Sequence, residues 1–163
     1  MELVLDCILH QKSAMPLMHA ALTDPDYGFD IADEAGHNMR IDIPVEQGGG
    51  GTGFRPMQTV LAALCGCSGV DVVSVLKKQK QELTGLEIKV DGEREKGKEP
   101  SLWETLHIRF ELSGVVEPGK AWRAVDLSVN KYCSVAETLR RAGAVITWSV
   151  VVNGDEVNTN RGL

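Results

Sequence analysis

The sequence predicts an α+β fold in which antiparallel sheets surround one long, buried helix. Several segments alternate apolar and polar residues, as strands with one solvated face do, and turn residues join them into hairpins. Residues 56–76 form a single long apolar stretch with helical spacing. The predicted order is strands, helix, strands, helices and a last strand, which is typical of α+β proteins and not of a doubly wound parallel sheet.

Length and charge limit the classes of function. A chain of 163 residues predicts one domain, 1–163. The formal net charge of -6 argues against a nucleic-acid partner or an anionic membrane surface. The start, Met-Glu-Leu-Val-Leu-Asp, lacks the basic segment of a signal peptide. Glycines and polar residues interrupt every apolar run before it reaches the roughly 18 residues of a membrane span. We therefore expect a cytoplasmic protein without a membrane partner.

The first third of the chain predicts mainly strands. Residues 2–11 read as a strand, whereas residues 13–23 have no clear period and predict a short helix or an irregular segment. Residues 27–34 and 39–43 alternate on either side of a turn and predict a β-hairpin. The glycine-rich run 47–53 predicts a flexible connection. It lacks the Lys-Ser/Thr ending of a phosphate-binding loop.

The stretch from Pro56 to Leu76 predicts a helix that is apolar on every side. Pro56 suits the first helical turn, where a missing N–H costs nothing. A helix that is apolar all round is usually buried in a core or an interface. Gly66 and Gly69 each cost about 1 kcal/mol relative to alanine inside a helix. We therefore expect another element to pack closely against this part of the helix.

The remaining chain alternates between strand and helix patterns. Two strands are expected to pair as an antiparallel hairpin, two helices follow, and a strand closes the domain. The expected elements are strands at 85–93 and 103–112, a helix after 117–120, a helix at 135–141 and a strand at 144–153. Ser134 is expected to cap the last helix, with Glu137 as its capping-box partner.

The four cysteines are Cys7, Cys65, Cys67 and Cys133. Each one, taken alone, is more often a packed core residue than a catalytic one. In a reducing compartment structural disulfides are not expected. Neither the cysteines nor the histidines have the spacing of zinc ligands, so we expect no metal site.

Four polar or reactive side chains have two interpretations each. Cys65 and Cys67 lie in the glycine-punctuated helix, which fits either a close helix crossing or a reactive thiol. Cys133 precedes a predicted helix, whose N-terminus can stabilise a thiolate, but a capping turn can also contain a cysteine by chance. Arg40 lies on the polar side of a strand. It is either solvated or placed to stabilise a thiolate and to bind a peroxide oxygen.

Three motifs resemble the OsmC/Ohr family of thiol peroxidases. They are residues 36–44, the run from 50 to 73 that contains Pro-x-x-x-x-Leu-Ala-Ala-Leu-x-x-Cys, and Lys-Tyr-Cys-Ser-Val at 131–135. The resemblance is closest to the less characterised OsmC-like branch and extends to about residue 153. Residues 12–26 look like an insertion.

The resemblance implies an intertwined homodimer with shared active sites and no cofactor. It implies reduction of organic or inorganic hydroperoxides by two cysteines, as part of oxidative stress defence. Cys67 matches the peroxidatic position, and Cys133 matches the resolving position, whose disulfide with Cys67 a dithiol reductant reopens. Arg40 matches the active-site arginine of the family.

One departure from the family pattern bears on activity. The glutamate that directly follows the proline in family peroxidases is Met57 here, followed by Gln58. Arg40 then has no evident carboxylate partner, and Asp42 and Asp71 are candidates to replace it. The departure keeps open a second interpretation, a non-catalytic OsmC-like protein that binds a small ligand or responds to redox state.

Overall fold

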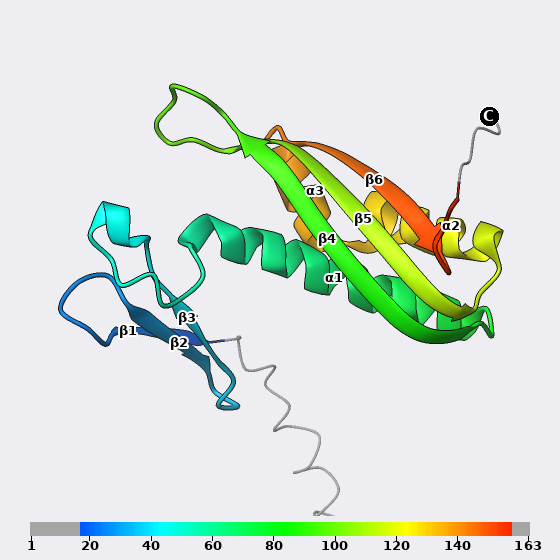
Figure 1. Cartoon of the computed structure of the whole chain (residues 1–163), viewed down its shortest axis with the longest axis horizontal. Helices are drawn as coiled ribbons and strands as arrows, with labels where there is room; N and C mark the ends of the chain where they lie inside the picture. Colours follow the sequence, from blue (N-terminus) through cyan, green and yellow to red (C-terminus); the bar gives the residue numbers. More distant parts are fainter. Residues whose placement is uncertain (1–16, 158–163) are drawn as a thin grey trace, which may run out of the picture. The chain divides into compact units, whose positions relative to one another are not determined.

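The computed structural model describes residues 17–157 of the chain (Figure 1). They form two compact units, which divide between Thr59 and Val60. The strand expected at residues 2–11, together with Cys7, lies outside the described residues.

The first unit contains a three-stranded antiparallel sheet in the order β1 (Met18–Leu22), β2 (Phe29–Asp33) and β3 (Asn38–Ile41). The β2–β3 hairpin was predicted. The strand β1 corrects the expectation of a helix or irregular segment at residues 13–23. Its sequence does not alternate, and backbone pairing with β2 over the whole length of β1 defines it instead.

The glycine-rich connection after β3 is an ordered loop, in contrast to the flexible connection expected. It begins with a short 3-10 turn, η1 (Val45–Gln47). A side chain at Gly53 would place its Cβ 2.6 Å from the Arg40 carbonyl oxygen, so the loop approaches β3 as closely as only glycine allows. The buried Asp42 carboxylate accepts hydrogen bonds from the Thr52 N–H at 3.0 Å and the Thr52 hydroxyl at 2.8 Å. These bonds hold the loop against β3.

The second unit contains a four-stranded sheet in the order β4 (Glu82–Arg94), β5 (Trp103–Val115), β6 (Val145–Val152) and β7 (Asp155–Glu156). The predicted β4–β5 hairpin is present. The strands β5 and β6 are parallel, so this sheet is mixed and not antiparallel throughout. Parallel neighbours need a long crossover connection, and the helices between β5 and β6 provide it.

Three helices lie on one face of this sheet (Figure 1): α1 (Pro56–Lys78), α2 (Pro118–Leu127) and α3 (Ser134–Arg141). One turn of π-helix, η2 (Ser128–Tyr132), follows α2 directly. The side chains between sheet and helices form one apolar core. Its fully buried members include Leu64, Val72, Leu76, Leu106, Ile108, Phe110, Leu112, Val125 and Val129.

Within one chain α1 is only partly buried. Its buried residues form one stripe, Leu64, Ser68, Gly69, Val72 and Leu76. A Cβ added at Gly69 would lie 2.9 Å from Ile88 Cδ1, so β4 packs closely against α1 there as predicted, whereas a Cβ at Gly66 would meet no atom within 4 Å and the predicted close packing is absent at that position.

The length and apolar composition of α1 are sufficient for a membrane span, which the interrupted sequence did not predict. Only 28% of its most apolar 18-residue window is buried in the chain. A single helix of this kind is weak evidence for a membrane, because the core helix of a soluble protein has the same properties. What α1 does show is an apolar surface that the described part of the chain leaves uncovered.

Candidate functional site

The second unit brings Cys67 and Cys133 together. Cys67 lies in the middle of α1, and Cys133 lies between η2 and α3. The Cys133 thiol lies close enough to the Cys67 sulfur to lower the pKa of Cys67. The Ser134 hydroxyl also lies 4.0 Å from Cys67 Sγ. Two thiols that are far apart in the sequence are therefore neighbours in the fold.

Two buried hydrogen bonds fix this arrangement. The Cys133 N–H donates to the Ser128 carbonyl at 2.9 Å and closes the π-helical turn. The hydroxyl of the same Ser128 donates to the Ser68 carbonyl of α1, also at 2.9 Å. Ser68 is the residue next to Cys67, and both serines are fully buried. The turn that carries Cys133 is thus anchored on the turn of α1 that carries Cys67.

Cys133 is itself the N-cap of α3. Its sulfur accepts a hydrogen bond from the Ala136 N–H at 3.4 Å. The expectation that Ser134 caps this helix with Glu137 is wrong, because α3 begins one residue earlier and Ser134 is its first residue. The sulfur takes the place that a serine or aspartate oxygen usually occupies.

The environment separates the protonation states of the two cysteines. Burial works to raise the pKa of Cys67, but hydrogen bonds from the Cys133 thiol, the Val135 N–H and the Ser134 hydroxyl outweigh it and lower this pKa. Burial, together with the hydrogen bond to Cys67, raises the pKa of Cys133 to about 11. The environment therefore favours a thiolate on Cys67 and a protonated thiol on Cys133. This is the charge distribution of a nucleophilic cysteine and a resolving cysteine.

Cys65 has a different environment, although it lies on the same helix. Burial raises the pKa of Cys65. Its side chain lines a hollow of about 620 Å³ beside α1 and β4, and the apolar walls of that hollow are Val70, Val73, Leu86 and Ile88. Cys65 thus lacks the donors that lower the pKa of Cys67. This difference distinguishes the two cysteines, which the sequence separated only through the family resemblance.

Arg40 belongs to the first unit, in strand β3. Its guanidinium forms ion pairs with Asp24 and, at 2.9 Å, with Asp30. It also donates to the hydroxyls of Thr52 at 2.7 Å and Thr23 at 2.9 Å. Arg40 is therefore held by four side chains and is not a freely solvated arginine.

The two carboxylates that hold Arg40 were missed by the sequence analysis. Asp42, the expected candidate in the same unit, does not pair with Arg40 among the described residues. Asp42 binds Thr52 instead, and the hydrogen bonds that Thr52 donates lower the pKa of Asp42 to about 2. A usable signal existed for Asp30, which faces Arg40 in the β2–β3 register, where opposite charges stabilise each other.

Comparison with known proteins identifies the family. A sequence profile of the OsmC-like proteins matches residues 48–149. The chain belongs to the OsmC-like family. The matched segment of this OsmC-like chain includes both Cys67 and Cys133, whereas Arg40 precedes it.

Individual relatives agree with this assignment. Protein YhfA of Escherichia coli K12 is 38% identical over 112 residues, which cover 66% of this chain and 78% of YhfA. A hypothetical protein from Aquifex aeolicus VF5 has a crystal structure with a TM-score of 0.70 and 29% identity, covering 85% of this chain and 98% of that one. An organic hydroperoxide resistance protein OsmC from Legionella pneumophila gives a TM-score of 0.66 at 17% identity over 85% and 97% of the two chains. The predicted OsmC-like fold is confirmed.

Residues 17–157 contain no cluster of three or more His, Cys, Asp or Glu side chains that could hold a metal ion.

The different pKa values of the two thiols give a pH-dependent prediction. In Cys133→Ala, Cys67 loses a hydrogen-bond donor, so its pKa should rise and its alkylation by iodoacetamide should need a higher pH. Mass spectrometry of the Cys67 peptide across a pH series measures the midpoint. Cys65→Ala is the matched control and should leave the midpoint where it is. An unchanged midpoint in Cys133→Ala would contradict the described hydrogen bond.

Proposed function

We propose that this protein is a thiol-dependent peroxidase that reduces small-molecule hydroperoxides through Cys67 and Cys133. The observation that carries the proposal is that buried hydrogen bonds through Ser128 anchor the turn of Cys133 on the turn of α1 that carries Cys67, whose pKa is lowered. The name of the Legionella pneumophila relative, an organic hydroperoxide resistance protein, supports the substrate class. The setting that we propose is oxidative stress defence in the cytoplasm, with no nucleic-acid or membrane partner.

The first step is attack of the Cys67 thiolate on the distal oxygen of the hydroperoxide. A sulfur–oxygen bond forms and the O–O bond breaks, so the sulfur is oxidised to a sulfenic acid and the peroxide is reduced to an alcohol after its oxygen gains a proton. The Cys133 thiol, the Val135 N–H and the Ser134 hydroxyl lower the pKa of Cys67 and so favour its reactive thiolate form before the attack.

The second step forms the disulfide. Oxidation of Cys67 removes the thiolate that helps to raise the pKa of Cys133, so that burial alone then opposes ionisation of Cys133. The Cys133 sulfur attacks the Cys67 sulfur, and the sulfenic oxygen leaves as water with the Cys133 proton. A dithiol reductant then reopens the disulfide by thiol–disulfide exchange and restores both thiols.

Arg40 enters the proposal through its match to the family arginine. We propose that it serves as the active-site arginine and stabilises negative charge on the peroxide oxygens. The ion pairs with Asp24 and Asp30 supply the support that a glutamate after the proline gives in family peroxidases. On this proposal Met57 does not disable the enzyme.

The proposal includes an intertwined homodimer with shared active sites. The uncovered apolar side of α1 supports it, with Val70 71% exposed. The neighbouring strand β4 is an edge of its sheet and spans 13 residues, so its outer backbone groups are available for pairing. A second copy of the chain would cover both features.

The hollow beside Cys65 is the observation that favours the second interpretation. Its volume of about 620 Å³ and its apolar walls suit a small apolar ligand. A protein that binds such a ligand saturably, and reduces no hydroperoxide, would be a binding or redox-responsive protein.

Turnover of cumene hydroperoxide with dithiothreitol tests the function. Cys67→Ser should lower the rate by about three orders of magnitude or more, as the loss of a nucleophile does. Cys133→Ser should still consume one equivalent without reductant and should stop at the sulfenic acid, while Cys65→Ser should keep the wild-type rate. Full activity in Cys67→Ser would show that the assignment is wrong.

The dimer is tested by sedimentation equilibrium at micromolar concentration. The wild-type protein should have twice the chain mass of 17.7 kDa. A charge placed on the apolar side of α1, in Val70→Asp, should shift the mass to that of one chain. Val115→Asp is the matched control, because Val115 is 73% exposed at the end of β5. A wild-type monomer, or a Val70→Asp dimer, would rule out this interface.

A further inference from the structure

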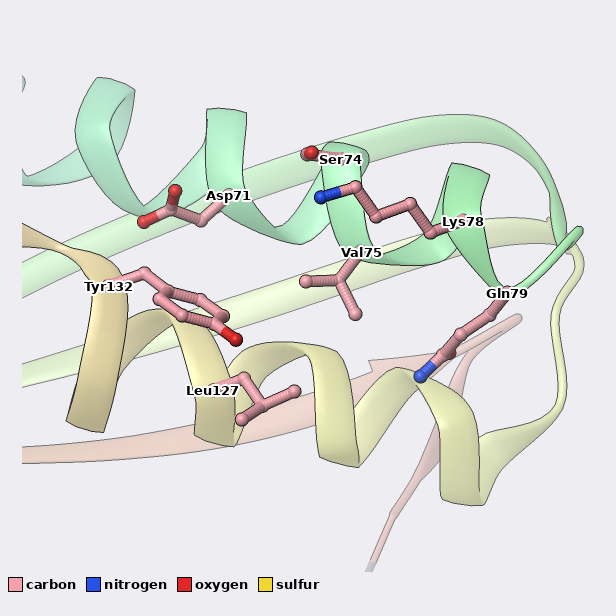
Figure 2. A pocket seen from close by; sticks show the side chains of 7 residues that line it. All are labelled: Asp71, Ser74, Val75, Lys78, Gln79, Leu127 and Tyr132. Carbon is pink, nitrogen blue, oxygen red and sulfur yellow. The ribbon is translucent and has the colours of Figure 1, made fainter.

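A hollow of about 420 Å³ lies between α1 and the α2–η2 segment, one turn along α1 from Cys67 (Figure 2). Figure 2 shows Asp71 on the α1 side facing the ring of Tyr132, with Val75 and Leu127 on opposite walls. Ser74, Lys78 and Gln79 complete the lining. The hollow is thus apolar along its middle and carries a carboxyl group at the end near Cys67.

The Asp71 carboxyl group is unusual in having a buried oxygen without a partner. Its Oδ2 is shielded from solvent and has no hydrogen-bond partner among residues 17–157. Buried polar atoms are nearly always paired, so this carboxyl oxygen at the edge of a hollow has its hydrogen-bonding capacity free for a ligand. Burial raises the pKa of Asp71, which favours its protonated form.

Asp71 and Cys67 act on each other. They are four positions apart on α1 and therefore lie on the same helix face. A negative charge on Asp71 raises the pKa of Cys67, so protonation of Asp71 favours the Cys67 thiolate. Of the other groups around the hollow, Lys78 is cationic, and the Lys131 ammonium lies 5.5 Å from the centre of the Tyr132 ring.

We propose that Asp71 is the general acid of the peroxidase reaction and protonates the oxygen that leaves when Cys67 attacks the hydroperoxide. This inference rests on the proposed function. The sulfur–oxygen bond forms to the distal oxygen, the O–O bond breaks, and its electron pair remains on the proximal oxygen. That oxygen takes the Asp71 proton and departs as the alcohol, and Asp71 recovers a proton from solvent. Val75 and Leu127 face the organic group of the substrate in the hollow.

The chemistry needs such a donor. Hydroxide, the leaving group from hydrogen peroxide, is the conjugate base of water, whose pKa is about 15.7, so it leaves poorly without a proton. A positioned general acid contributes about 10²- to 10⁴-fold to a rate. Peracetic acid provides the contrast, because its leaving group is a carboxylate that is stable without a proton.

The test compares two oxidants on Asp71→Asn, which keeps the size of the side chain and removes its acid proton. Single-turnover oxidation of Cys67 is followed by quenching and mass spectrometry. Oxidation by cumene hydroperoxide should slow by about 10²-fold, in the range of lost general acid catalysis. Oxidation by peracetic acid and alkylation by iodoacetamide should stay near the wild-type rates. Asp91→Asn, an exposed aspartate on β4, is the matched control and should change neither oxidation.

The outcomes separate the two proposals. Equal slowing with both oxidants would show that Asp71 only positions other groups, and unchanged rates with both would show that it has no role. Either result overturns the general acid while the peroxidase proposal stands. If wild-type Cys67 reacts with neither oxidant, the peroxidase proposal fails and the role of Asp71 fails with it.

Discussion

The arrangement of the two thiols depends on the buried hydrogen bonds of one turn, in which the Cys133 N–H donates to Ser128 and the Ser128 hydroxyl donates to Ser68 of α1. In that position Cys133 Sγ accepts the Ala136 N–H as the cap of α3, and its thiol contributes to the lowered pKa of Cys67. A structural role and a chemical role therefore meet in one buried atom. Formation of a disulfide would change both, so the start of α3 and the redox state of the pair are physically linked.

Several groups in the described part of the chain lack the contacts that a folded protein normally provides. One side of α1 is apolar and uncovered, β4 has an unpaired edge, and Asp71 Oδ2 has no partner among the described residues. Such features destabilise an isolated folded chain, since buried polar groups and apolar surfaces are normally satisfied. A second copy of the chain and a bound substrate would together satisfy them. The proposed dimer and the proposed general acid therefore explain one set of features.

The sequence was most informative where local pattern decides the structure. The alternation in β4 and β5 and the apolar run of α1 gave these elements correctly, because burial of one strand face or of a helix requires such patterns. The sequence was least informative where contacts between segments far apart in the chain determine the structure. The strand β1 exists through its hydrogen bonds to β2, and the carboxylates of Asp24 and Asp30 meet Arg40 only after the loop and the sheet have folded. Likewise, no local signal told Cys67 from Cys65, because the donors that distinguish them come from α3.

The central claim is that Cys67 and Cys133 form one redox pair. Peptide mapping under non-reducing conditions tests it most directly, after the reduced protein has reacted with one equivalent of hydrogen peroxide and free thiols have been blocked. The account predicts one new disulfide, between Cys67 and Cys133 of the same chain, with Cys65 recovered as a blocked thiol. A disulfide that contains Cys65, or a protein whose Cys67 and Cys133 are both still free after the peroxide is consumed, would contradict it.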